Sequence, residues 1–109
     1  MKLNQICNGL EYTCLQGSME AEVRDIVYDS RKLAKETMFV CMAGAVTDGH
    51  RYIPDAVEKG ASVIVVERRK EAEGIPGEIT VLLVASTRRA LALMSAGLFG
   101  HPAKKIVTI

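Results

Sequence analysis

The segment Val23-Arg24-Asp25-Ile26-Val27-Tyr28-Asp29-Ser30-Arg31 begins with β-branched residues and ends in a polar group. Valine and isoleucine fit the half-buried surface of a pleated strand, so the sequence predicts a strand over Val23–Tyr28. The strand should stop abruptly at Asp29-Ser30-Arg31, whose side chains accept, exchange and donate hydrogen bonds. Such a polar strand end predicts a ligand-binding site. The alternative is a plain turn in which Ser30 caps the backbone.

A second polar loop follows the apolar run Met38-Phe39-Val40-Cys41-Met42. An unbroken apolar run of this kind is typical of a strand covered on both faces. The loop after it, Gly44-Ala45-Val46-Thr47-Asp48-Gly49-His50, has glycines near both ends, and glycine permits backbone angles and close approaches that other residues resist. Open α/β sheets bind ligands where loops leave the carboxyl ends of their strands. We therefore expect the two loops to form one binding site.

The rest of the chain alternates between helix and strand patterns. Apolar spacing predicts three helices: Leu3–Leu10, Arg51–Lys59, and a third from Ser86 or Thr87 to Phe99. Short apolar runs predict four further strands: Tyr12–Leu15, Ala61–Glu67, Ile79–Val84 and Lys105–Ile109. The alternation predicts an α/β fold, a layered domain with a mixed or mostly parallel sheet flanked by helices.

Local signals fix the boundaries of the second helix. Asp48 should cap its start, Pro54 is tolerated only in its first turn, and Gly60 should cap its end. The mixed-charge segment Arg68–Glu78 contains glycines and a proline, which predicts a solvated surface loop rather than a phosphate site.

Composition limits the classes of function. The 109 residues, 49% apolar and 25% charged, suffice for one globular domain. The formal charge of +1 provides no general field for nucleic acid or an anionic membrane. No signal segment or membrane-length apolar run occurs. The three cysteines lack the paired spacing of a zinc site, so we expect reduced, buried or half-buried thiols in a cytoplasmic protein: Cys7, Cys14 and Cys41.

No catalytic set can be completed from the sequence. Ser30 as a nucleophile would need a histidine base and an orienting acid, but the only histidines are His50 and His101, and no G-x-S-x-G elbow occurs. Ser30 is therefore predicted to bind a base or sugar edge. The glycine-bounded loop is not a Walker loop. It either cradles phosphate through backbone N–H groups or forms a plain turn with a helix cap. Asp48 and His50 form no metal-ligand set.

Several ordered motifs resemble one family. They are Asp29-Ser30-Arg31, Met38-Phe39-Val40, Gly44-x-x-x-Asp48-Gly49-His50-x-Tyr52-Ile53, Ala56-x-x-x-Gly60-Ala61 and Phe99-Gly100-His101-Pro102. From about Val23 to Ile109 the chain resembles the N-terminal domain of the Mur ligases. Within the family it is most similar to the member that adds the third peptide residue of the peptidoglycan precursor.

The resemblance implies a site for the uridine and diphosphate end of UDP-MurNAc-L-Ala-D-Glu. Ser30 matches the family's uracil-contacting serine, and Tyr28 stands two residues before it. The loop positions that contact the nucleotide match Ala45, Val46 and Thr47. Some relatives have histidine or tyrosine at the first of these, whereas Ala45 offers only its backbone and a methyl group. The expected supporting residues are Asp29, Arg31, Asp48, Gly49 and His50.

For a whole ligase, the resemblance implies that ATP and magnesium drive formation of an acyl phosphate and then of an amide with diaminopimelate or lysine. Residues 1–109 are then a single N-terminal domain that precedes the ATP-binding domain, holds no cofactor or metal and is inactive alone. The expected partners are the UDP-sugar-peptide and the other ligase domains, with no nucleic acid and no membrane. Two alternatives are the sister ligase that adds D-alanyl-D-alanine and a stand-alone nucleotide- or partner-binding regulatory module.

Overall fold

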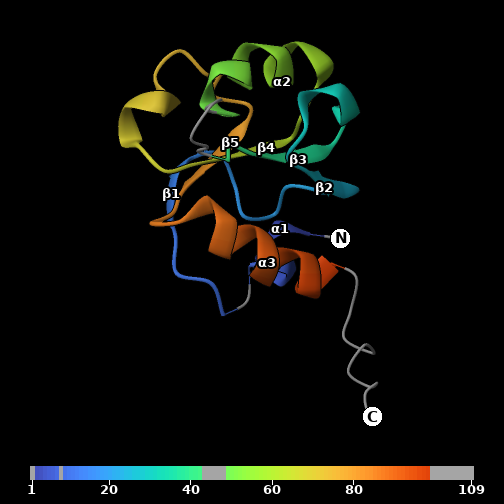
Figure 1. The fold of residues 1–109 in the computed structure, drawn as a ribbon, viewed down its shortest axis with the longest axis vertical. Helices are drawn as coiled ribbons and strands as arrows, with labels where there is room; N and C mark the ends of the chain where they lie inside the picture. The colour runs from blue at the N-terminus through green and yellow to red at the C-terminus, as the bar shows by residue number, and fades with distance from the viewer. Residues whose placement is uncertain (1, 8, 43–48, 99–109) are drawn as a thin grey trace.

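The computed structural model describes residues 2–7, 9–42 and 49–98. They form a five-stranded sheet of order β1-β5-β4-β3-β2. Figure 1 shows α2 on one side of this sheet and α1 and α3 on the other. The strands are β1 (Thr13–Gln16), β2 (Asp25–Val27), β3 (Thr37–Val40), β4 (Val63–Val66) and β5 (Thr80–Leu83). The helices are α1 (Leu3–Ile6), α2 (Ile53–Lys59) and α3 (Thr87–Leu98), with 3-10 turns η1 (Ser30–Lys32), η2 (Gly49–Tyr52) and η3 (Arg69–Ala72).

The sheet is mostly parallel, which confirms the predicted α/β class. Strands β2, β3, β4 and β5 run parallel to their neighbours, and only the edge strand β1 is antiparallel, against β5. The carboxyl ends of the four parallel strands therefore meet at one edge of the sheet. The turn after β2 and the loop after β3 leave from neighbouring strands at that edge, as the sequence predicted.

Successive residues of the central strands point to opposite faces of the sheet, so each face has its own hydrophobic core. One row across the sheet, Val40–Val65–Leu82, packs with α1 and α3. The next row, Val27–Phe39–Ile64–Val81, packs with α2 on the opposite face. All residues of β3 and β4 are buried, because both faces are covered. Burying each such side chain contributes about 1.5–3 kcal/mol, so this sheet is a firm support for the loops at its edge.

The local signals around α2 are confirmed where the structure describes them. Pro54 lies in the first turn, and Gly60 caps the end in the left-handed conformation at φ 90°. Ser86 precedes α3, and its hydroxyl accepts the Arg89 N–H at 3.3 Å, as expected of a cap. The proposed cap at Asp48 and the predicted strand Lys105–Ile109 lie outside the described residues.

Several predicted boundaries were wrong. The first helix is a single turn that ends at Ile6 instead of Leu10, because Gly9 turns the chain at φ 89°. The predicted strand Val23–Tyr28 is limited to Asp25–Val27, the only residues with ladder partners in β3. The helix expected from Arg51 begins at Ile53 after the 3-10 turn η2, and the expected loop after β4 contains the turn η3.

Candidate functional site

A cleft of about 490 Å³ lies at the carboxyl ends of β2 and β3. The turn after β2 supplies one wall. Met42 and the two ends of η2 supply the other. Its lining residues are Tyr28, Asp29, Ser30, Arg31, Met42, Gly49 and Tyr52. The structure thus brings together five of the residues selected from the sequence. Their role in binding stays a prediction.

The turn after β2 is held by an internal ion pair. Asp29 caps η1 by accepting the Arg31 backbone N–H at 2.9 Å. The Arg31 guanidinium also grips the Asp29 carboxylate, with Nη2 at 2.8 Å from Oδ2 and Nε at 3.1 Å from Oδ1. These side-chain bonds are the main reason why the pKa of Asp29 is lowered to about 2, and the backbone bond adds to the effect. The two charges are therefore engaged with each other, and they fix the shape of the turn.

Ser30 differs from its neighbours Asp29 and Arg31 in its hydrogen bonding. The residue is half-buried, and its backbone carbonyl accepts the Leu33 N–H at 3.3 Å. Its hydroxyl, however, has no hydrogen-bond partner among the residues that the structure describes. Ser30 also lines the cleft, and a serine hydroxyl can both donate to a ligand and accept from one. Beside it the Tyr28 side chain is 61% exposed, the largest exposure of any large apolar side chain in the described chain.

Gly49 closes the second loop at its base. Its N–H donates to the Met42 carbonyl at 2.7 Å. A Cβ at this position would lie 2.7 Å from the Met42 nitrogen, closer than real Cβ atoms approach. Only glycine fits here, so the predicted importance of Gly49 has a steric cause. Met42 and Gly49 both line the cleft.

The remaining loop predictions divide into two groups. Ala45, Val46, Thr47 and Asp48 lie outside the described residues. His50 is described, but it does not line the cleft: it is only 4% exposed, and its Nε2 accepts the Glu67 backbone N–H at 3.0 Å. His50 is therefore buried and is not part of the cleft surface.

Tyr52 lines the cleft but was not selected from the sequence as a site residue. It ends η2, and the guanidinium carbon of Arg51 lies 5.6 Å from the centroid of its ring, within the range of a cation–π contact. Together with Tyr28 it provides aromatic surface on both walls. The available signal was the aromatic position in the motif Asp48-Gly49-His50-x-Tyr52.

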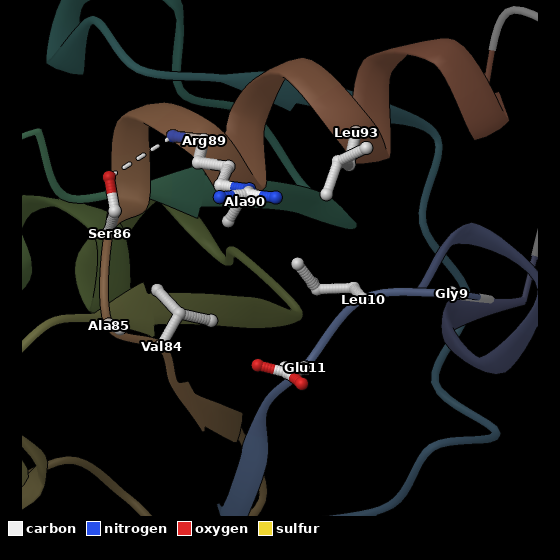
Figure 2. A pocket seen from close by; sticks show the side chains of 9 residues that line it. All are labelled: Gly9, Leu10, Glu11, Val84, Ala85, Ser86, Arg89, Ala90 and Leu93. Carbon is white, nitrogen blue, oxygen red and sulfur yellow. Dashed lines mark hydrogen bonds between the residues drawn. The ribbon is translucent and has the colours of Figure 1, made fainter.

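A second cavity, of about 380 Å³, lies between the start of α3 and the segment that leads into β1. Figure 2 shows Leu10, Val84 and Leu93 pointing toward its centre, with the charged ends of Glu11 and Arg89 nearby. Among the described residues, every buried side-chain nitrogen or oxygen has a hydrogen-bond partner. This cavity contains none of the site residues predicted from the sequence, and its walls combine apolar side chains with the polar residues Glu11, Ser86 and Arg89.

Metal ligation and thiol chemistry find little support in the described part of the chain. It holds no group of three or more His, Cys, Asp or Glu arranged to bind a metal ion. All three cysteines are free, as predicted, but Cys14 is exposed rather than buried. Burial is the main reason why the pKa of the Cys7 thiol is raised to about 11, and the nearby Cys14 adds to the effect. A thiol with so high a pKa is unreactive. Within the same residues, no helix has the length and apolar character needed to cross a membrane.

Comparisons with known proteins agree on one family. Residues 22–98 match the family described as "Mur ligase family, catalytic domain". The whole chain is 39% identical to the UDP-N-acetylmuramoyl-L-alanyl-D-glutamate--2,6-diaminopimelate ligases of Clostridioides difficile and Clostridium tetani. In each case it spans 22% of the relative, about a fifth of its length.

Solved structures show the same similarity. The UDP-N-acetylmuramoylalanyl-D-glutamyl-2,6-diaminopimelate--D-alanyl-D-alanyl ligase of Acinetobacter baumannii matches with a TM-score of 0.71 and 28% identity. The match covers 88% of this chain and 21% of that one. A MurF ligase of Thermotoga maritima in complex with ADP matches with a TM-score of 0.55 and 29% identity, over 67% of this chain and 16% of that one.

Proposed function

This chain belongs to the Mur ligase family, and from that premise we propose that residues 1–109 are the N-terminal substrate-binding domain of an ATP-dependent ligase. The proposed substrate is UDP-MurNAc-L-Ala-D-Glu, and the added residue is the third of the peptidoglycan peptide. Relatives named as diaminopimelate ligases, 39% identical over the whole chain, favour diaminopimelate over lysine.

One observation carries the proposal: Ser30 lines the cleft, and its hydroxyl has no hydrogen-bond partner among the described residues. A uracil ring presents carbonyl acceptors and an N–H donor, and a hydroxyl can meet either. The Tyr28 and Tyr52 rings offer flat apolar surfaces for a planar base. The cleft volume of about 490 Å³ also lies within the usual range for small-molecule sites, roughly 300–1,000 Å³.

The diphosphate is proposed to follow the loop that joins Met42 to Gly49. Both of these flanking residues line the cleft, which supports the proposal. By resemblance, Ala45, Val46 and Thr47 contact the nucleotide there. Arg31 is 87% exposed at the same cleft but is paired with Asp29. This pairing favours a role in shaping the turn over binding of phosphate.

The chemistry of the whole ligase belongs outside these residues. We propose that it uses ATP and Mg²⁺ to activate the D-glutamyl carboxylate as an acyl phosphate before the amide forms. The relative in complex with ADP supports a nucleotide site in the larger protein. This domain contributes binding and orientation of the UDP end, and we predict that it hydrolyses no ATP alone. An ATP-consuming reaction of this kind fits the cytoplasm.

A paired assay tests the proposal against its main alternative, the D-alanyl-D-alanine-adding ligase, a solved member of which is also similar to this chain. The full-length protein is given ATP, Mg²⁺ and either UDP-MurNAc-L-Ala-D-Glu with diaminopimelate or lysine, or the UDP-tripeptide with D-alanyl-D-alanine. Phosphate release and product mass are then measured. We expect product only from the first combination. Product only from the second supports the sister ligase. UDP-sugar binding without either product supports a regulatory module.

A further inference from the structure

A chain of hydrogen bonds runs behind the cleft along the carboxyl edge of the sheet. It is centred on Glu67, the residue that follows β4. Its backbone N–H donates to His50 Nε2 at 3.0 Å. Its carboxylate Oε2 accepts from the Thr87 N–H at 2.7 Å and from the Thr87 hydroxyl at 2.8 Å. These bonds join the turn η2 on one side of the sheet edge to the start of α3 on the other.

Glu67 is the fixed point of this chain. A carboxylate at a helix N-terminus is stabilised by the helix dipole, and its two bonds to Thr87 are short and charge-assisted. Thr87 is 1% exposed, so water competes little for these bonds. The position of the Glu67 backbone is therefore set by β4 and α3, and η2 is attached to it through His50.

We propose that His50 is a positioning residue for the uridine cleft, which it shapes by holding the η2 turn against Glu67. The inference rests on the proposed function. Gly49 and Tyr52, at the two ends of η2, line the cleft, whereas His50 does not. His50 is 4% exposed, and an acceptor lost there leaves the Glu67 N–H unpaired in the interior. The turn must then move to admit water, and it carries Tyr52 with it.

The imidazole has to be neutral at Nε2 to accept this bond. Three substitutions separate the effect of the acceptor from the effect of the bulk of the ring. His50→Phe keeps a ring of similar shape without an acceptor. His50→Gln keeps an acceptor oxygen at a reach close to that of Nε2, whereas His50→Asn places it one bond shorter.

The test measures kcat and the KM for UDP-MurNAc-L-Ala-D-Glu in the full-length ligase. We expect His50→Phe to raise KM about fivefold to tenfold, the effect of roughly one lost hydrogen bond, and to change kcat less than about twofold because the reacting carboxylate is remote. His50→Gln should restore KM to within about twofold of wild type, and His50→Asn should not. Ile75→Ala is the matched control, because Ile75 is buried in the core on the α2 face and does not line the cleft. It should lower the melting temperature and leave KM unchanged.

Each outcome is decisive. If His50→Phe lowers the melting temperature as Ile75→Ala does and leaves KM at the wild-type value, His50 is only a core residue and the inference is wrong. If His50→Phe does not fold, equal KM values for the Gln and Asn variants overturn the inference, and an Asn value well above the Gln value supports it. If the wild-type ligase itself does not bind the UDP substrate, the proposed function fails instead.

Discussion

The two cavities lie at the same edge of the sheet and differ in the residues that form their walls. The cleft beside β2 and β3 contains the Ser30 hydroxyl, which has no partner among the described residues, and an aromatic ring on each wall. The cavity beside α3 is lined by apolar side chains such as Leu10 and Leu93 together with the charged Glu11 and Arg89, and its Ser86 hydroxyl accepts a bond from the helix. The volumes, about 490 and 380 Å³, are similar. Aromatic rings on both walls, which are absent from the described residues that line the second cavity, therefore separate the two better than size does.

The largest expected effect comes from breaking the wall of the first cleft at Gly49. Gly49→Ala puts a Cβ 2.7 Å from the Met42 nitrogen, so the backbone has to shift. We expect a loss of about 1–3 kcal/mol in the free energy of unfolding, the usual cost of overpacking, with weaker binding of the UDP substrate. Denaturant titration measures the first effect and calorimetry the second.

Gly77→Ala is the matched control for Gly49→Ala, because an added Cβ there meets nothing within 4 Å. It should change the unfolding free energy by less than about 0.5 kcal/mol. Equal stability and affinity in the two alanine variants would show that the close approach at Gly49 does not shape the cleft.

Ser30→Ala sharpens the comparison at its centre. Removing one neutral hydrogen bond to a ligand should cost about 1 kcal/mol, or more if a buried partner is left unpaired, which corresponds to a several-fold to tenfold rise in KM for the UDP substrate. The turnover number should change much less, because the uridine end contributes nearly uniform binding. A serine nucleophile would instead lose turnover by orders of magnitude.

The control for Ser30→Ala lies in the second cavity. Leu93 is 46% exposed there, so Leu93→Ser should leave both KM and the melting temperature close to wild type. Wild-type KM in Ser30→Ala combined with a raised KM in Leu93→Ser would reverse the assignment of the two cavities.

The smallest effect concerns the ion pair that shapes the turn after β2. Hydrogen bonds from Arg31 lower the pKa of Asp29 from 3.8 to about 2. Because the folded-state pKa is depressed, the stabilisation is present above about pH 4 and is lost as the pH falls through 2. Asp29→Asn removes this titration. As the pH is lowered from 4 to 2, the melting temperature of the wild type should therefore fall further than that of Asp29→Asn. Parallel curves over that range would mean that the pair contributes nothing to the fold.

Much of the fold was predictable because the deciding signals are local. The apolar runs of β3, β4 and β5 need cover on both faces, and Pro54 and Gly60 mark the ends of α2 through their own backbone limits. The failures had two causes: a local turn at Gly9 ends the first helix early, and other boundaries depend on distant partners. Leu10 follows the helical spacing of the first helix, yet it packs on the core from outside that helix. The length of β2 is set by its pairing with β3.

The site shows the same division. The polar turn Asp29-Ser30-Arg31 was visible because it interrupts an apolar strand. The position of Tyr52 on the opposite wall depends on how η2 folds back, and no local pattern contains that information. The positioning role proposed for His50 depends on its hydrogen bond with Glu67, which lies 17 residues away in the chain. Sequence alone could mark His50 as part of a motif but could not assign it a partner.

Hydrogen–deuterium exchange of the full-length ligase, with and without saturating UDP-MurNAc-L-Ala-D-Glu, tests the difference between the two cavities most directly. Peptides that cover Tyr28–Lys32 and Gly49–Tyr52 should gain protection, because their amides line or support the proposed uridine cleft. Peptides that cover Gly9–Thr13 and Val84–Leu93 should exchange at unchanged rates. Protection confined to the second pair of peptides, or no protection in the first pair at saturation, would contradict the assignment of the UDP end to the cleft beside β2 and β3.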